Sequence, residues 1–221
     1  RTKMKIIVAG ATGNTGQRLV RELNDRGLNP VAMVRDSSDT SRLPEGVEQR
    51  KADLTQLDDD VANGCDVVVF AAGSGGNTSD EMTDKVDRDG AKRLIDLSVA
   101  SNVRRFVMLS SIGAGDPDPD HELANYLQAK HEADEHLMET QLEYAILRPV
   151  ALTDDEGTGE VRLGENVDPK GEAARGDVAK LLADAVEALA ETGQWEGNFR
   201  IAINLSPTQV RSPHLVDVVA R

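Results

Sequence analysis

The chain has 221 residues, and its 39 acidic against 25 basic side chains give a formal charge of −14 at neutral pH. A chain of this length can bury a sizeable core without structural metals, and its one cysteine, Cys65, cannot form an internal disulfide. No apolar run approaches the roughly 20 residues that span a bilayer. A chain this negative also lacks the basic surface that would bind the phosphates of a nucleic acid. These properties predict a cytoplasmic protein that binds neither membranes nor nucleic acids.

The charged residues are dominated by a few residue types. Only 8 of the 25 basic residues are lysine, whereas aspartate alone supplies 23 side chains. This skew is expected of a halophilic protein that stays solvated in concentrated salt, and an ordinary acidic surface is the alternative. A melting midpoint that does not respond to KCl would exclude the halophilic hypothesis.

Short apolar runs alternate with amphipathic stretches along the chain, without an internal repeat or a break in composition. Several runs are apolar on both faces, as buried parallel strands are, and the alternation predicts crossover helices on both faces of one sheet. We expect an α/β fold, a doubly wound parallel sheet of the Rossmann type, forming one domain over residues 1–221. The predicted strands are 4–9, 30–34, 47–51, 66–71, 105–109, 144–147 and 198–205. The predicted helices are 15–26, 57–63, 83–101, 123–140 and 177–191, followed by a short C-terminal helix.

The alternation loosens after Pro149 into a stretch over residues 153–171 that is rich in glycine and acidic residues. Irregular segments that a rigid scaffold positions commonly carry binding residues. We expect residues 150–221 to include small substrate-side elements and a substrate lid.

A glycine motif follows the first predicted strand and opens the first helix. Gly10 permits a tight turn, Gly13 lets the backbone approach a pyrophosphate, and Gly16 allows close packing of helix and sheet. Free amides at the helix start then face the anion. A structural turn is the alternative, but the order of strand, glycines and amphipathic helix predicts a dinucleotide site. Its members are Gly10, Thr12, Gly13, Asn14, Thr15 and Gly16.

The end of the second predicted strand discriminates between the two nicotinamide cofactors. An acidic residue there binds the adenosine ribose of NAD, whereas an arginine holds the 2′-phosphate of NADP. Arg35 lies 19 positions after Gly16, and Ser37 and Arg42 add donors. We predict NADP(H) as the preferred cofactor, with NAD(H) and a surface pair between Arg35 and Asp36 as the alternatives.

A second motif, Tyr126-Leu127-Gln128-Ala129-Lys130, lies in a predicted helix after the fifth strand. At positions i and i+4 the tyrosine and lysine share one helix face, so the ammonium can stabilise a phenolate. This lowers the pKa of the tyrosine below its ordinary value of about 10, so the tyrosine can donate a proton nearer to neutral pH. An amphipathic helix with an exposed lysine is the alternative. Ser110 and Ser111 end the fifth strand, and either hydroxyl can donate to a substrate carbonyl.

Together these motifs resemble those of an atypical short-chain dehydrogenase/reductase. The resemblance is to the short NAD(P)-binding branch, which is NAD-dependent epimerase/dehydratase-like and NmrA-like, and it covers nearly the whole chain. Besides the glycine, Arg35 and Tyr126 motifs, it rests on Asp53-Leu54, Ala71-Ala72-Gly73, Leu109-Ser110-Ser111-Ile112-Gly113, Leu147-Arg148-Pro149 and Arg175-Gly176-Asp177-Val178-Ala179.

The resemblance implies roles for these positions. Ser111, Tyr126 and Lys130 would form the catalytic triad, with Lys130 also holding the nicotinamide ribose. The other residues that it places against the cofactor are Asp53 and Leu54 at the adenine, Ala71, Ala72 and Gly73 beside the ribose, Ser110, and Pro149 and Val150 near the nicotinamide.

The expected function is hydride transfer between NADP(H) and a small carbonyl or quinone-like substrate. Only some 70 residues follow Pro149, so we expect little room for the nucleotide-gripping domain of sugar epimerases and dehydratases. That activity remains one alternative, and a catalytically silent NADP(H) sensor is the other. His121, His131 and His136 lie in one acidic helical stretch and its entry loop, but His131 and His136 are five positions apart and face different sides, so we expect a solvated surface and no metal site. The sequence leaves the oligomeric state open between monomer and homodimer.

Overall fold

The computed structural model describes residues 4–75, 78–164, 167–191 and 200–207. Its centre is an eight-stranded sheet in the order β3-β2-β1-β4-β5-β6-β10-β8. All neighbouring strands are parallel except β8, which runs antiparallel to β10 at one edge. This confirms the predicted doubly wound α/β fold of the Rossmann type. The strands are β1 (Lys5–Ala9), β2 (Asn29–Val34), β3 (Glu48–Lys51), β4 (Val67–Phe70), β5 (Arg105–Leu109), β6 (Glu143–Pro149), β8 (Val161–Leu163) and β10 (Arg200–Pro207).

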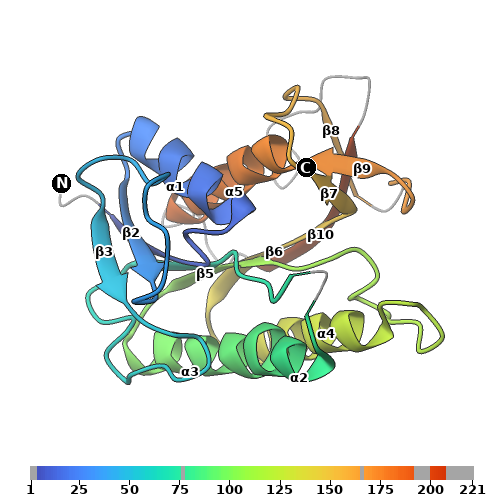
Figure 1. Ribbon diagram of the computed structural model, residues 1–221, viewed down its shortest axis with the longest axis horizontal. Coiled ribbons are helices and arrows are strands. Elements are labelled where there is room, and N and C mark those ends of the chain that lie inside the picture. The colour runs from blue at the N-terminus through green and yellow to red at the C-terminus, as the bar shows by residue number, and fades with distance from the viewer. Residues whose placement is uncertain (1–3, 76–77, 165–166, 192–199, 208–221) are drawn as a thin grey trace.

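Helices cover both faces of this sheet, as Figure 1 shows. One layer holds α1 (Asn14–Asp25) and α5 (Arg175–Glu191), which pack against each other. The opposite layer holds α2 (Asp80–Thr83), the π-helical segment η1 (Asp84–Gly90), α3 (Ala91–Ala100) and α4 (Ala124–Met138). The two layers bury two separate apolar clusters, one on each face of the sheet.

The burial of the central strands follows from their composition. All four residues of β4 are apolar and buried, and β5 and β6 are buried over most of their lengths. Side chains of a strand alternate between its two faces, so a strand in a sheet covered on both sides must be apolar throughout. In α1, by contrast, Leu19, Val20 and Leu23 form one buried stripe.

The first six predicted strands and four of the five predicted helices are present, with ends that differ by up to three residues. The prediction of a helix over residues 57–63 was wrong. This segment forms successive turns, in which the amides of Val61 and Asn63 donate to the carbonyl groups of Asp58 and Asp60. Its second to fourth residues, 58–60, are aspartates, and aspartate favours turns over helix interiors because its side chain competes for backbone groups.

The predicted helix over residues 83–101 is one continuous helical run of three segments, α2, η1 and α3, from Asp80 to Ala100. It begins three residues early because Ser79 caps it, accepting a hydrogen bond from the amide of Met82. At Gly90 the run touches the turn after β3 so closely that a Cβ would lie 2.8 Å from the carbonyl oxygen of Leu54.

The region after β6 is more ordered than the sequence indicates. Two short strands, β7 (Ala151–Thr153) and β9 (Glu172–Ala174), pair in parallel as a separate small sheet, and β8 joins the main sheet. The last predicted strand, over residues 198–205, corresponds to β10. Its first two residues lie outside the described residues, as does the predicted C-terminal helix. Among the described helices, none combines the length and the apolar character that crossing a bilayer requires.

Candidate cofactor and substrate site

The turn between β1 and α1 has the geometry that the glycine motif predicts. Gly10 adopts a left-handed conformation with φ of +78°, and a Cβ there would lie 2.5 Å from the Cα atom of Ala72. A Cβ at Gly16 would overlap the carbonyl oxygen of Gly10. Gly13 is exposed, and a Cβ there would meet only that oxygen, at 3.3 Å. Gly10 and Gly16 are therefore required by close packing, whereas Gly13 lies at the open mouth of the turn.

The N-terminus of α1 is open to an anion. Its N-cap is Gly13, no described side chain caps it, and its first turn contains no acidic residue. The first amides of a helix lack partners within the helix, and the helix dipole makes this end positive. Gly13 and Asn14 are exposed, Thr12 is half-buried, and Thr15 is buried. The backbone here can bind a diphosphate without any basic side chain.

The predicted ligand-binding residues after the parallel strands gather at the edge where this turn lies. Ala71, Ala72 and Gly73 follow β4, and the amide of Ala71 donates to the carbonyl of Ala9. Ser110 and Ser111 follow β5, and the amide of Ser110 donates to the carbonyl of Leu147 in β6. Pro149 and Val150, at the end of β6, are buried. The carboxyl ends of β1, β4, β5 and β6 thus form one continuous edge.

Arg35 lies at the end of β2, exposed to solvent, and makes no ion pair with any described residue. Its backbone amide donates to the hydroxyl of Ser38, and its side chain contributes to a low pKa of Asp53, after the stronger effect of the hydrogen bonds from Thr55. Asp36 pairs instead with Lys51, at 3.3 Å. The alternative pairing of Arg35 with Asp36 is therefore absent. Ser37 and Arg42 are also exposed.

The turn after β3 carries the two residues that the resemblance assigns to the adenine. Asp53 accepts hydrogen bonds from the amide and hydroxyl of Thr55, at 2.8 and 2.7 Å. Leu54 is half-buried and lines an open cavity of about 540 Å³ between this turn and the helical run of α2, η1 and α3. Met82, Lys85 and Arg93 contribute to its opposite wall.

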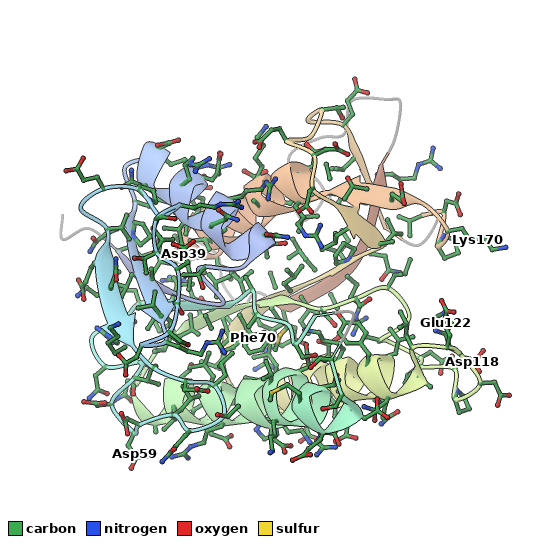
Figure 2. All side chains as sticks on the ribbon, viewed as in Figure 1. Asp39, Asp59, Phe70, Asp118, Glu122 and Lys170 are labelled. Carbon is green, nitrogen blue, oxygen red and sulfur yellow. The ribbon has the colours of Figure 1, made fainter. Side chains whose placement is uncertain are left out.

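Tyr126 and Lys130 share one face of α4, as predicted from their spacing. The ammonium nitrogen of Lys130 lies 5.6 Å from the centre of the Tyr126 ring and 5.3 Å from that of Phe70, which Figure 2 labels between the sheet and the helix layer. Tyr126 is half-buried, whereas Lys130 is only 2% exposed. The expectation of an exposed lysine, the alternative for this motif, is therefore wrong.

Three oxygen atoms surround the ammonium group of Lys130. Asp87 Oδ1 lies at 2.9 Å, and the carbonyl oxygens of Ala72 and Leu109 accept hydrogen bonds at 3.4 Å. Burial by itself would lower the pKa of Lys130, but the nearby Tyr126 and Asp87 outweigh it, and the pKa lies above its ordinary value. The lysine is therefore a buried cation below the ends of β4 and β5.

The two serines after β5 have different surroundings. Ser110 is buried, and its hydroxyl donates to Asp134 Oδ2 at 2.9 Å. The Nε of Arg148 donates to the same oxygen at 3.0 Å. Ser111 is half-buried, and its hydroxyl makes only a long hydrogen bond of 3.3 Å to the carbonyl of Ile112. Of the two hydroxyls, that of Ser111 is the freer to meet a substrate.

Two arginines hold the acidic segment after β7. Arg18 of α1 donates to the carbonyl of Asp154 at 2.6 Å, and Arg175 of α5 binds its carboxylate at 3.1 Å. Asp177 accepts hydrogen bonds from the amides of Thr158 and Gly159. The segment expected to act as a substrate lid is thus fastened to the N-terminal halves of both helices in one layer.

Sequence reasoning missed two residues of this site, Asp87 and Asp134, which are both fully buried. Asp134 lies four positions after Lys130 and eight after Tyr126, so the helical spacing was a signal that could have found it. Asp87 had no such signal, because it is one of 39 acidic residues and its partner is 43 positions away. Among the described residues, no group of three or more histidine, cysteine or acidic side chains is arranged to hold a metal ion.

A Rossmann sheet with an open glycine turn at its carboxyl edge defines a dinucleotide-binding protein. Residues 10–188 match a family of NAD(P)H-binding proteins, and the chain belongs to this family. The match agrees with the resemblance seen in the motifs.

Several named proteins are similar to the chain over most of its length. It is 36% identical over 190 residues to the "Uncharacterized sugar epimerase YhfK" of Bacillus subtilis, covering 83% of this chain and 88% of that protein. A solved structure from Bacillus halodurans, named a "Putative NAD-dependent epimerase/dehydratase", has a TM-score of 0.83 at 30% identity and covers 98% of this chain and 99% of its own. The oxidoreductase ylbE of Lactococcus lactis has a TM-score of 0.76 at 27% identity, with coverage of 94% and 93%.

Proposed function

We propose that the chain is an NADP(H)-dependent oxidoreductase that acts on a small carbonyl or quinone-like substrate. One observation carries the proposal. A half-buried tyrosine, Tyr126, lies against a buried ammonium, Lys130, at the sheet edge onto which the glycine turn opens. An anion site for the cofactor and a group suited to donate a proton thus share one edge, where ligands of doubly wound sheets bind.

The residues present fit a nicotinamide dinucleotide. The uncapped N-terminus of α1 and the exposed Gly13 suit its diphosphate. Arg35, exposed and without an ion pair among the described residues, suits a 2′-phosphate at the end of β2. Leu54 and its open cavity suit the adenine, and Ala71, Ala72, Gly73, Pro149 and Val150 suit the remainder of the molecule.

The bound cofactor supplies or accepts the hydride. In the direction of reduction, Tyr126 donates its proton to the substrate oxygen, and the charge of Lys130 favours the phenolate that results. Ser111 donates a hydrogen bond to the same oxygen and polarises the carbonyl. In the direction of oxidation, the phenolate of Tyr126 takes the proton from the substrate hydroxyl.

The names of two relatives favour a second candidate, epimerisation of a sugar substrate. The two activities differ in one measurable respect, since an epimerase returns its cofactor unchanged after each turnover. Net oxidation of NADPH by an aldehyde, quinone or flavin supports the oxidoreductase. Conversion of a sugar nucleotide without net change in nicotinamide absorbance supports the epimerase instead.

The test of the mechanism is Tyr126→Phe, which removes only the phenolic hydroxyl. General acid catalysis is worth about 10²–10⁴ in rate, so we expect a loss of turnover of about that size with NADPH affinity unchanged. Tyr144→Phe is the matched control, because Tyr144 is a buried residue of β6 with its side chain in the apolar cluster. Full turnover by Tyr126→Phe would refute the mechanism. Absence of NADPH and NADH binding in calorimetry would refute the function altogether.

A further inference from the structure

An ion pair lies entirely inside the protein, beneath the candidate site. Asp87 is 0% exposed and Lys130 is 2% exposed, and their charged atoms are 2.9 Å apart. The second carboxylate oxygen of Asp87 accepts a hydrogen bond of 3.0 Å from the amide of Ser74, in the loop after β4. Asp87 therefore joins the π-helical segment η1, the β4 loop and α4 at one point. Such π-helical turns are uncommon and often occur at functional sites.

The contacts of Lys130 determine what its ammonium can do. An ammonium has three N–H donors. The carbonyl oxygens of Ala72 and Leu109 accept hydrogen bonds from it, and the carboxylate of Asp87 pairs with it at 2.9 Å. The charge of Lys130 therefore acts on the ring of Tyr126 from inside the protein, 5.6 Å from the ring centre.

A buried ammonium needs a compensating charge, because burial in an apolar interior strongly favours its neutral form. The groups that face Lys130 come from three directions. Helix α4 contributes Tyr126 and Asp134, the strand ends contribute two carbonyl groups and the Phe70 ring, and η1 contributes Asp87. Asp134 already binds Ser110 and Arg148. Asp87 is thus the carboxylate that balances Lys130.

We propose that Asp87 is a positioning residue, which keeps Lys130 ionised and anchored beneath the sheet edge, so that the charge of Lys130 acts on Tyr126. The role of Tyr126 as proton donor rests on the proposed function. The ionisation of Lys130 is measurable without turnover.

The test uses the fact that the chain contains two tyrosines. In a Tyr144→Phe background, the ultraviolet absorbance of tyrosinate follows the titration of Tyr126 alone. Asp87→Asn and the double variant Asp87→Asn/Lys130→Met are compared with this background. We expect the titration midpoint to rise by at least 1 pH unit in both, because Lys130 loses its proton in the first and is absent from the second.

Asp84→Asn is the matched control. Asp84 lies in the same η1 segment and pairs with Arg88 at 3.4 Å near the surface, so the change in formal charge is identical. The titration midpoint of Tyr126 should not change. If Asp87→Asn fails to fold, the double variant carries the test, since it removes both buried charges together.

One result would overturn the proposal. A titration midpoint of Tyr126 that stays constant or falls in Asp87→Asn means that Lys130 keeps its charge without Asp87, or that its charge does not act on Tyr126. If the unsubstituted protein binds no NADPH, the proposed function fails, whereas the tyrosinate titration still decides whether Asp87 controls Lys130.

Discussion

The two halves of the candidate site are built by different means. At the β1–α1 turn the proposed binding groups are backbone amides, and Gly10, Gly13 and Gly16 leave the space that side chains would fill. Around α4 the groups are charged and polar side chains, and the charges are paired, Lys130 with Asp87, which are both buried, and the buried Asp134 with the partly buried Arg148.

This difference has consequences for how each half responds to change. A backbone site fails when a side chain occupies space that the main chain needs, and the effect depends on the distance to the nearest backbone atom. A paired-charge site fails when one partner is removed, because the other charge is then left buried without compensation. The first half should therefore be sensitive to volume and the second to charge and pH.

The largest expected effect comes from volume at Gly16. A Cβ there would overlap the carbonyl oxygen of Gly10, which is backbone and cannot yield. We expect Gly16→Val to lower the free energy of unfolding by about 3 kcal/mol and to abolish NADPH binding. Urea unfolding and calorimetry measure the two quantities.

Gly13→Ala is the informative counterpart in the same turn. Its Cβ would meet only the oxygen of Gly10, at 3.3 Å, so we expect little change in stability and a weaker NADPH affinity. Equal loss of stability in the two variants would contradict the distinction between a packing glycine and one at the open mouth.

A smaller effect concerns the choice of cofactor at the end of β2. We expect Arg35→Ala to weaken NADPH binding about tenfold, roughly 1.4 kcal/mol, and to leave NADH binding within twofold. The reason is that a 2′-phosphate is present only in NADPH. Lys51→Ala removes the same charge from the neighbouring strand and serves as control, because Lys51 already pairs with Asp36. Equal weakening of both cofactors by Arg35→Ala would disprove the assignment of NADP(H).

The smallest effect is a pH dependence in the charged half. Burial raises the pKa of Asp134, although Arg148 and Ser110 oppose this. The folded protein thus holds this proton more tightly than the unfolded chain, so stability falls as pH rises from about 4 through the higher folded pKa. Across this pH range, the free energy of unfolding of the unsubstituted protein should fall relative to that of Asp134→Asn. The fall should be about 1.4 kcal/mol for each unit by which the folded pKa of Asp134 exceeds its unfolded pKa.

Urea unfolding of both proteins at several pH values gives this difference directly. Asp118→Asn, in the exposed loop before α4, is the control and should leave the pH dependence unchanged. If the two proteins differ in free energy of unfolding by the same amount at every pH, burial does not raise the pKa of Asp134.

Much of the fold could be predicted because its signals are local. The runs that became β1, β2, β4, β5 and β6 are apolar on both faces, and their alternation with helices leaves few topologies. The helix predicted over residues 57–63 failed for a local reason as well, since its three apolar residues, Leu57, Val61 and Ala62, suggested a helix while three aspartates favoured turns. The short strands β7, β8 and β9 had no such pattern, because three residues are too few to show a period.

The amino-acid sequence by itself determined the order of the strands β1 to β6 and of the four main helices, the glycine turn, and the common face of Tyr126 and Lys130, since each depends on residues close together along the chain. Only the tertiary structure decided that Lys130 is buried, that Asp87 is its partner and that Ser110 binds Asp134 rather than solvent. These pairs join residues 43 and 24 positions apart. In a chain with 39 acidic residues, which of them meets a given lysine depends on how the helices pack on the sheet.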